Sequence, residues 1–229
     1  MLIDGVVEDP VIGSDSEIEL KHPLSAAERA AVSHAAPNRL AEFTTVRACA
    51  ARALRRLGEY ETEIVPDAHR APIWPRHLVG SLTHCEGYCA AAVARKAHIR
   101  GIGIDVEPNL PISDELTRQL ILGAEEHALC QALAFNHASI NWERLIFSAK
   151  ESLFKAWWPL TLTWLDFDDV VLLPRANGDF VAHISGELAA MKLFGSSEVV
   201  GRWAAGRGFI MTSVVLPVDE HIGEPRCTD

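Results

Sequence analysis

The sequence predicts a mixed α+β fold in which each half of the chain combines helices with a small sheet. Apolar residues recur at helical spacing from about Ala41 to Leu57 and again from about Asn141 to Trp158, as in helices packed against a core. Residues 99–106 alternate as a half-buried strand does. A proline-bounded segment, 108–111, interrupts the pattern. We therefore place the division between the halves at residue 108.

The N-terminal half is expected to begin with two helices. Ser25 is a good N-cap for a short helix reaching His34, because Glu28 stands where a capping-box partner is needed. The second helix should end at Gly58, a residue suited to the left-handed position after a helix. A proline-rich loop over 66–75 follows, and strands are expected at 80–83, 88–94 and 99–106.

The C-terminal half is expected to begin with a helix at Ser113, followed by one at Ala124–Phe135. The long helix should stop at Pro159, because proline lacks the N–H that continues a helix. Three further strands are predicted at Val170–Leu173, Phe180–Ile184 and Phe209–Val215. The last of them is the only element that we expect after Gly195.

Charge and cysteine content narrow the functional class. The formal net charge of −10 argues against a nucleic-acid or anionic-membrane binder, since both surfaces require clustered Lys and Arg. A protein of this charge that handles phosphates must gather positive charge locally or recruit a metal. Five cysteines, an odd number without a disulfide spacing, suit a reducing compartment. With no signal peptide or membrane-spanning run in the sequence, we expect a cytoplasmic location.

Two carboxylates end the strand over residues 99–106. Asp105 and Glu107 are two residues apart, so they project from the same face. Neighbouring carboxylates on one face favour a cation between them, and Mg²⁺ prefers oxygen ligands. The alternative is a strand that ends in solvent with two exposed acids.

Glu151 and Lys155 share one face of the long helix, because they lie four residues apart. A surface ion pair of this kind contributes only about 0.3–0.5 kcal/mol. The helix is apolar on several sides, however, and such a helix is largely covered. The pair therefore lines a cleft more readily than a solvated face.

A third group follows the proline-rich loop. Arg70 offers a forked donor for phosphate, and Thr83 and His84 add a hydroxyl and an imidazole. The alternative for His84 is a structural histidine. Zinc bound by His84, Cys85 and Cys89 is disfavoured, because no second pair of ligands accompanies them.

Taken together, these motifs resemble the 4′-phosphopantetheinyl transferases, in the branch that serves bacterial siderophore and polyketide synthesis. The resemblance rests on Gly-Ser-Leu-Thr-His-Cys at 80–85, Gly-Ile-Asp-Val-Glu-Pro at 103–108 and Phe-Ser-Ala-Lys-Glu-Ser-Leu-Phe-Lys-Ala-Trp at 147–157. Upstream, Arg39, Glu42, Phe43 and Arg47, and the loop at 70–75, fit the same branch.

The resemblance implies two similar subdomains related by a pseudo-twofold, residues 1–108 and 109–229, with the active site in the cleft between them. It implies transfer of the phosphopantetheine arm of coenzyme A (CoA) to a serine of an apo carrier protein, with release of adenosine 3′,5′-bisphosphate. Mg²⁺, for which Mn²⁺ could substitute, would be held by Asp105, Glu107 and Glu151.

The resemblance also assigns the remaining site residues. Glu151 and Lys155 would be catalytic, with Glu151 accepting the serine proton directly or through a metal-bound water. Lys155 would steady the pyrophosphate. The residues implied to contact CoA are Arg39, Arg47, Arg70, Thr83, His84, Asp105, Lys150 and Lys155. Carrier docking would use Phe154, Trp157, Trp158 and Leu160, for which ordinary core packing is the alternative.

The implied partners are acyl or peptidyl carrier domains of fatty acid, polyketide or nonribosomal peptide synthases, and the branch suggests a monomer. Two other functions would use the same residues. One is a carrier-binding protein without catalytic activity, which the intact acids and Lys155 disfavour. The other is a magnesium-dependent hydrolase of CoA or a related pyrophosphate. A requirement for a carrier serine distinguishes them.

Overall fold

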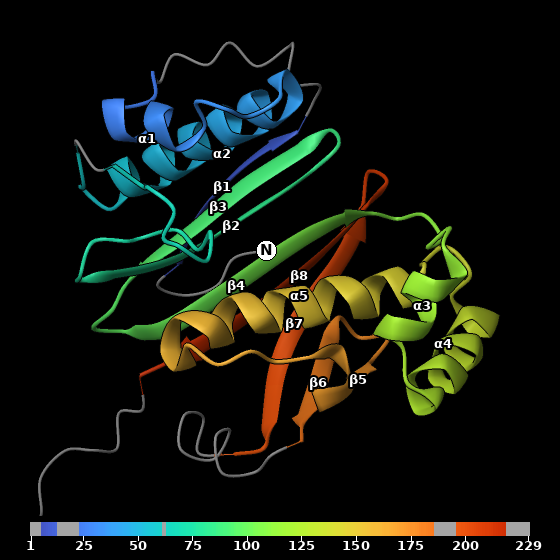
Figure 1. The fold of residues 1–229 in the computed structure, drawn as a ribbon. Helices are drawn as coiled ribbons and strands as arrows, with labels where there is room; N and C mark the ends of the chain where they lie inside the picture. Colours follow the sequence, from blue (N-terminus) through green and yellow to red (C-terminus); the bar gives the residue numbers. More distant parts are fainter. Residues whose placement is uncertain (1–5, 13–22, 61–62, 186–195, 219–229) are drawn as a thin grey trace, which may run out of the picture.

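The computed structural model describes residues 23–60, 63–185 and 196–218, together with the backbone of 6–12. It is a mixed α+β fold, as the sequence predicts, built from two antiparallel sheets (Figure 1). Among the described residues, no helix combines the length and apolar character that crossing a membrane requires. The elements in chain order are β1 Val6–Ile12, α1 Ala26–Ala31, α2 Pro37–Arg56, β2 Leu78–Cys85, β3 Tyr88–Arg95, β4 Ile99–Pro108, α3 Glu115–Ile121, α4 Ala124–Asn136, α5 Trp142–Thr161, η1 Phe167–Asp169, β5 Val170–Pro174, β6 Asp179–Ile184, β7 Glu198–Gly206 and β8 Phe209–Pro217.

The first sheet has the order β1-β3-β2 and is covered on one face by α1 and α2 (Figure 1). The predicted capping box is present, because Ser25 Oγ accepts from Glu28 N–H and the Glu28 carboxylate accepts from Ser25 N–H. Helix α2 begins at Pro37, four residues before the predicted start, since proline fits the first helical turn. Its buried face packs on β3 around Val46, and the other buried residues of this core are Cys49, Ala50, Ala53, Leu54, Ile64, Leu78, Cys89, Ala91 and Val93.

The second sheet has the order β4-β8-β7-β6-β5, and α5 lies along one of its faces (Figure 1). Leu145, Ile146 and Leu153 of α5 are completely buried against it. Helices α3 and α4 gather at the N-terminal end of α5 (Figure 1). This helix-on-sheet layer forms the larger core of the molecule.

Strand β4 joins the two sheets. Its backbone pairs with β8, while its edge toward the first sheet is held by two side chains of β2. Ser81 Oγ accepts from Ile104 N–H at 3.0 Å, and Thr83 Oγ1 accepts from Val106 N–H at 3.1 Å. The division that we expected at residue 108 places β4 in the N-terminal part, whereas this pairing places it in the C-terminal sheet.

Helix α5 approaches β4 unusually closely because Gly103 has no side chain. A Cβ atom at Gly103 would lie 1.7 Å from the Ser152 carbonyl oxygen. Backbone contact of this kind is what a glycine inside a strand permits. It brings the middle of α5, where Glu151 lies, beside the carboxylates of β4.

Two sequence expectations were wrong in the second half. Helix α5 continues through Pro159 to Thr161, since proline loses only one hydrogen bond near a C-terminus and Leu162 closes the helix in the left-handed region, at φ 52°. Strand β7 was not expected at all. Its Gly and Ala residues give it little intrinsic strand preference, but it is hydrogen-bonded on both edges, to β6 and β8.

Candidate active site

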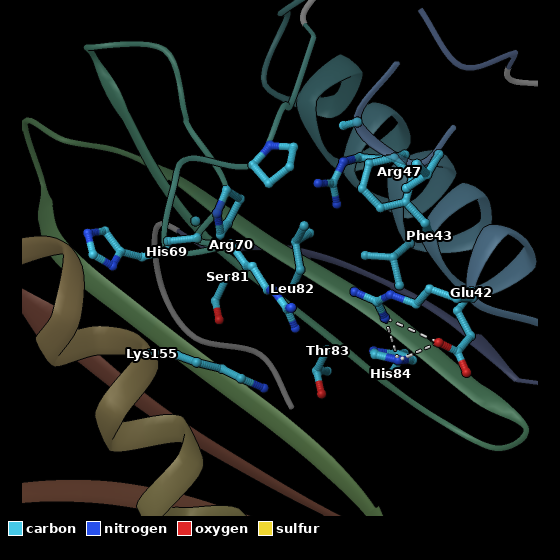
Figure 2. Close-up of a pocket in the computed structure, with 18 of the residues that line it drawn as sticks. Glu42, Phe43, Arg47, His69, Arg70, Ser81, Leu82, Thr83, His84 and Lys155 are labelled. Atoms are coloured by element: carbon cyan, nitrogen blue, oxygen red, sulfur yellow. Dashed lines mark hydrogen bonds and ion pairs between the residues drawn. The ribbon is translucent and has the colours of Figure 1, made fainter. Parts of the chain in front are cut away.

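A cavity of about 870 Å³ lies between helix α5 and the N-terminal layer that contains α2 and β2, within the usual range for ligand pockets of about 300–1,000 Å³. Its walls are α2, the segment that precedes α2, the proline-rich loop, β2 and the C-terminal half of α5. Figure 2 shows Lys155 reaching in from α5, opposite Arg70, Thr83 and His84. The predicted site residues that line the cavity are Arg39, Arg47, Arg70, Thr83, His84, Glu151 and Lys155.

Asp105 is buried at the inner edge of this cavity, where only 6 % of it is exposed. Its Oδ1 atom accepts from Lys155 Nζ at 2.6 Å and from Thr83 Oγ1 at 3.2 Å. Its Oδ2 atom is buried and has no hydrogen-bond partner among the residues that the structure describes. A buried carboxylate oxygen without a partner is costly, and it is available to an added cation.

The negative charge of Asp105 affects the pKa values of Glu107 and Glu151. Burial, and next the Asp105 carboxylate, raise the pKa of Glu107 to about 7 against the opposing effects of Arg144 and Lys155. Burial and Asp105 likewise raise the pKa of Glu151, while Lys155 lowers it. Three carboxylates therefore share one region in which negative charge is unfavourable, and a cation would relieve that cost.

The predicted carboxylates do not form a closed metal cage. Among the residues that the structure describes, no three His, Cys, Asp or Glu side chains converge closely enough to hold a metal ion. Protein cations contact two of the acids, Lys155 at Asp105 and Arg144 at Glu107, where Arg144 Nη1 lies 3.1 Å from Glu107 Oε2. The chemistry of the site nevertheless fits a hard divalent cation, because Asp105 Oδ2 is unpaired and the donors are all oxygen.

Thr83 supports Asp105 rather than presenting a free hydroxyl to the cavity. Its Oγ1 atom donates to Asp105 and accepts from Val106 N–H. Lys155 is similarly fixed, because Nζ also donates to the Ile104 carbonyl at 3.2 Å. The pair holds the Asp105 carboxylate in a single orientation.

The other wall is basic. Arg47 is 6 % exposed, and its Nε atom donates to the Ile64 carbonyl at 2.6 Å. Burial lowers the pKa of Arg47 to about 10, with Glu28 opposing the shift, so the side chain stays charged at neutral pH. Arg70 lies on the loop at a φ of 68°, a left-handed conformation that is uncommon for a residue with a side chain.

Lys150 does not fit the CoA-binding role that was expected for it. Its Nζ atom is buried and donates to the Glu126 carboxylate and to the carbonyls of Ile121 and Phe167, at 2.8–2.9 Å. These contacts use all three ammonium protons, and Lys150 does not line the main cavity. It lies on the side of α5 that packs against α4.

Two of the residues considered for carrier docking also belong to the core. Trp157 is 2 % exposed, and its Nε1 atom donates to the Thr163 carbonyl. Leu160 packs on the same core. Phe154 and Trp158 instead line the cavity, with their rings stacked at a centroid distance of 6.0 Å.

Several residues at the cavity were not predicted. Glu42 accepts from Arg39 and His84, and His69 contacts the Trp158 ring at 5.0 Å, which joins the loop to α5. Trp164 packs on Phe154 at 5.0 Å. Sequence spacing gave no signal for His69 or Trp164, because both lie in loops, where neither helical nor strand periodicity applies. Glu42 carried a signal in its place between Arg39 and Arg47.

Known proteins match the chain along most of its length. A family model described as the 4′-phosphopantetheinyl transferase N-terminal domain matches residues 27–94, and one described as the 4′-phosphopantetheinyl transferase superfamily matches residues 101–206. A holo-ACP-synthase structure from Plasmodium yoelii shares 17 % identity with a TM-score of 0.40 over 52 % of this chain and 95 % of its own, a likeness too low to carry weight.

Three curated relatives have comparable lengths. The 4′-phosphopantetheinyl transferase Svp of Streptomyces mobaraensis is 43 % identical over 88 % of this chain and 81 % of its own. The transferase PptT of Mycobacterium tuberculosis is 36 % identical, covering 76 % and 78 %. Enterobactin synthase component D of Escherichia coli is 36 % identical, covering 67 % and 75 %. The resemblance read from the motifs is thus confirmed, and the chain belongs to the 4′-phosphopantetheinyl transferase superfamily, in the branch that includes enterobactin synthase component D.

Proposed function

We propose that this transferase uses CoA as donor and moves its phosphopantetheine arm to a serine of an apo acyl or peptidyl carrier protein. The observation that carries the proposal is the charge of the cavity. In a chain of net charge −10, basic side chains from α2, the loop, β2 and α5 meet in one cavity, which Glu151 also lines and where Lys155 contacts Asp105. This arrangement supplies locally the positive charge that a polyanionic nucleotide requires.

Arg39, Arg47, Arg70 and His84 would bind the nucleotide phosphates. Arginine is suited to this role because its planar fork matches two phosphate oxygens at once. Arg47 is held in place by its bond to the Ile64 carbonyl and by the Phe43 ring, which lies 4.0 Å from its guanidinium carbon. A cation ordered before the ligand arrives loses less entropy on binding.

Asp105, Glu107 and Glu151 would hold Mg²⁺ or Mn²⁺. The unpaired Asp105 Oδ2 atom and the raised pKa values of the two glutamates support this assignment. When bound, the ion would neutralise charge on the pyrophosphate as the bond to phosphorus breaks.

The transfer step needs a proton acceptor and a charge that stabilises the leaving group. The serine oxygen attacks the β-phosphorus, an O–P bond forms, and the P–O bond to the α-phosphate breaks to release adenosine 3′,5′-bisphosphate. Glu151 lines the cavity, and its raised pKa favours acceptance of the serine proton. Lys155 lies 2.6 Å from Asp105 and would donate to the pyrophosphate from the same position.

The carrier protein would approach over the aromatic cluster of Phe154, Trp158 and Trp164, where Trp164 is 65 % exposed. An exposed aromatic side chain at the rim of a cavity is typical of an interaction site. We further propose that the protein works as a cytoplasmic monomer on polyketide, fatty acid or nonribosomal peptide carriers, including those of siderophore synthesis.

Product analysis tests this function. CoA, Mg²⁺ and an apo carrier should yield adenosine 3′,5′-bisphosphate, which chromatography quantifies, and a carrier whose acceptor serine is replaced by alanine should yield none. Nucleotide release with the alanine carrier would indicate a hydrolase. No release with carriers of all three classes would favour a carrier-binding protein without catalytic activity.

A further inference from the structure

Glu42 is an acid in the basic wall of the cavity. Its Oε2 atom lies 3.2 Å from Arg39 Nη1 and 3.1 Å from His84 Nε2, and Figure 2 shows Glu42 and His84 joined in this way. In the tautomer that is protonated on Nε2, His84 donates to this carboxylate, which can only accept. Two donors from different elements, α2 and β2, therefore converge on one oxygen.

The two donors are themselves close together. Arg39 Nη1 and His84 Nε2 lie 3.2 Å apart. Arg39 donates to this nitrogen in the tautomer protonated on Nδ1, whereas in the tautomer protonated on Nε2 the two N–H donors repel unless they share an anion. Glu42 supplies that anion. Without it, Arg39 would be free to swing away, because 53 % of its side chain is exposed.

Fold stability does not account for the cluster. The side chains of Glu42 and His84 are 36 % and 34 % exposed, and exposed ion pairs contribute about 0–1 kcal/mol. A carboxylate also opposes the binding of phosphates nearby. Its presence here is explained if ordering the two cations gains more ligand affinity than the negative charge loses.

We propose that Glu42 is a positioning residue for CoA, which holds Arg39 and His84 in the arrangement that binds phosphate. This inference rests on the proposed binding of CoA in the cavity. Glu42 acts through its two partners, so its removal raises the KM for CoA and leaves kcat nearly unchanged. In a variant without the Glu42 carboxylate, Arg39 Nη1 and His84 Nε2 are no longer fixed before CoA binds.

The test measures CoA affinity and steady-state kinetics for Glu42→Gln, Glu42→Asp and a matched control. Glu59 is that control, because its Oε1 atom also binds a histidine and an arginine, His77 at 2.9 Å and Arg95 at 3.5 Å, but it does not line the cavity. We expect Glu42→Gln to weaken CoA binding about three- to tenfold and to raise KM equally. Glu42→Asp should recover part of the loss, and Glu59→Gln should bind as the wild type does.

A double-mutant cycle isolates the positioning role. In an Arg39→Gln, His84→Gln background, the additional change Glu42→Gln should have little effect, because Glu42 has nothing left to hold. Unchanged or tighter CoA binding by Glu42→Gln, or an equal loss in Glu59→Gln, would overturn the inference. Failure of the wild type to bind CoA would instead remove the proposed function, and the inference with it.

Discussion

Arg70 combines a strained backbone with a proposed phosphate contact. Its φ of 68° lies in the left-handed region, which costs a residue with a Cβ atom roughly 1–2 kcal/mol. The turn is held by Asp67, whose Oδ1 accepts from the N–H groups of His69 and Ala71. Strain of this kind is often found where a side chain is needed for function.

Arg70→Gly should therefore make the protein more stable but weaken its binding of CoA. We expect the free energy of unfolding to rise by up to about 1 kcal/mol, and CoA affinity to fall about tenfold. Arg207→Gly is the matched control, because Arg207 has a φ of 53° in the turn between β7 and β8 and does not line the cavity. Urea unfolding and calorimetric CoA titration measure both quantities. Equal CoA affinity in the two variants would remove Arg70 from the site.

Glu107 makes stability depend on pH. Its pKa in the folded protein is about 7, against an ordinary value of 4.5, so between these values the folded state binds a proton that the unfolded chain has released. Stability should thus fall as the pH rises through this window. Glu107→Gln stays neutral throughout and can still accept from Arg144.

In EDTA, the wild type should lose about 1–3 kcal/mol more than Glu107→Gln between pH 5 and pH 8. Urea unfolding of both proteins at the two pH values gives the comparison. Parallel losses in the two proteins would show that Glu107 is ionised in the folded state well below pH 7, contrary to the prediction.

At the scale of single elements, the buried pair Lys150 and Glu126 joins α5 to α4 and β5. Glu126 is 1 % exposed, and its carboxylate also accepts from the N–H groups of Gly123 and Leu172. Lys150 completes the set with its bonds to two carbonyls. The pair fixes the orientation of α5, on which Glu151 and Lys155 depend.

Lys150→Met should leave the Glu126 charge buried without a counterion, at a cost of about 3–5 kcal/mol. The double variant Lys150→Met, Glu126→Gln should regain part of this loss, because the unpaired charge is removed. Urea unfolding measures both changes. A loss below about 1 kcal/mol for Lys150→Met would mean that the pair contributes no more than a surface contact does.

The elements that sequence reasoning found are those with strong local signals. Ser25 with Glu28, and the helical spacing of α2 and α5, predicted helices that the structure contains. Strand β7 was not predicted from the sequence, because its stability comes from pairing with a strand on each edge. Gly201, for example, leaves room for the Phe180 ring, from which a Cβ atom would be only 2.0 Å away. Contacts between distant segments of this kind leave no local pattern.

The structure brings some of the expected site residues together and places others elsewhere. Asp105 and Lys155 were expected near one another, and the structure joins them at 2.6 Å. Lys150 was expected to contact CoA from the family resemblance, but it adjoins Glu151 in the sequence, and a step of one residue on a helix turns a side chain to another face. Glu107 was expected to bind metal, but its partner Arg144 was not foreseen, because no motif considered in the sequence joins the two residues.

For the molecule as a whole, two sheets meet at β4, and the basic cavity lies between the N-terminal layer and α5. Net charge −10 is compatible with the proposed polyanionic substrate because Arg39, Arg47, Arg70 and His84 gather on the N-terminal wall of this cavity. Glu151 and Lys155 line the wall that α5 forms, and Lys155 contacts Asp105 of β4. Close packing at Gly103 sets the distance between these groups.

The most direct measurement is the intact mass of an apo carrier protein incubated with CoA, Mg²⁺ and the enzyme, beside a sample with EDTA. We expect a gain of one phosphopantetheine unit that EDTA abolishes, and at least about a hundredfold slower gain with Glu151→Gln. Glu143→Gln should act as the wild type does, because Glu143 lies on the same helix but pairs with Arg118 and His127, away from the cavity. An unmodified carrier, or a gain that persists at full rate in EDTA or in Glu151→Gln, would contradict this expectation.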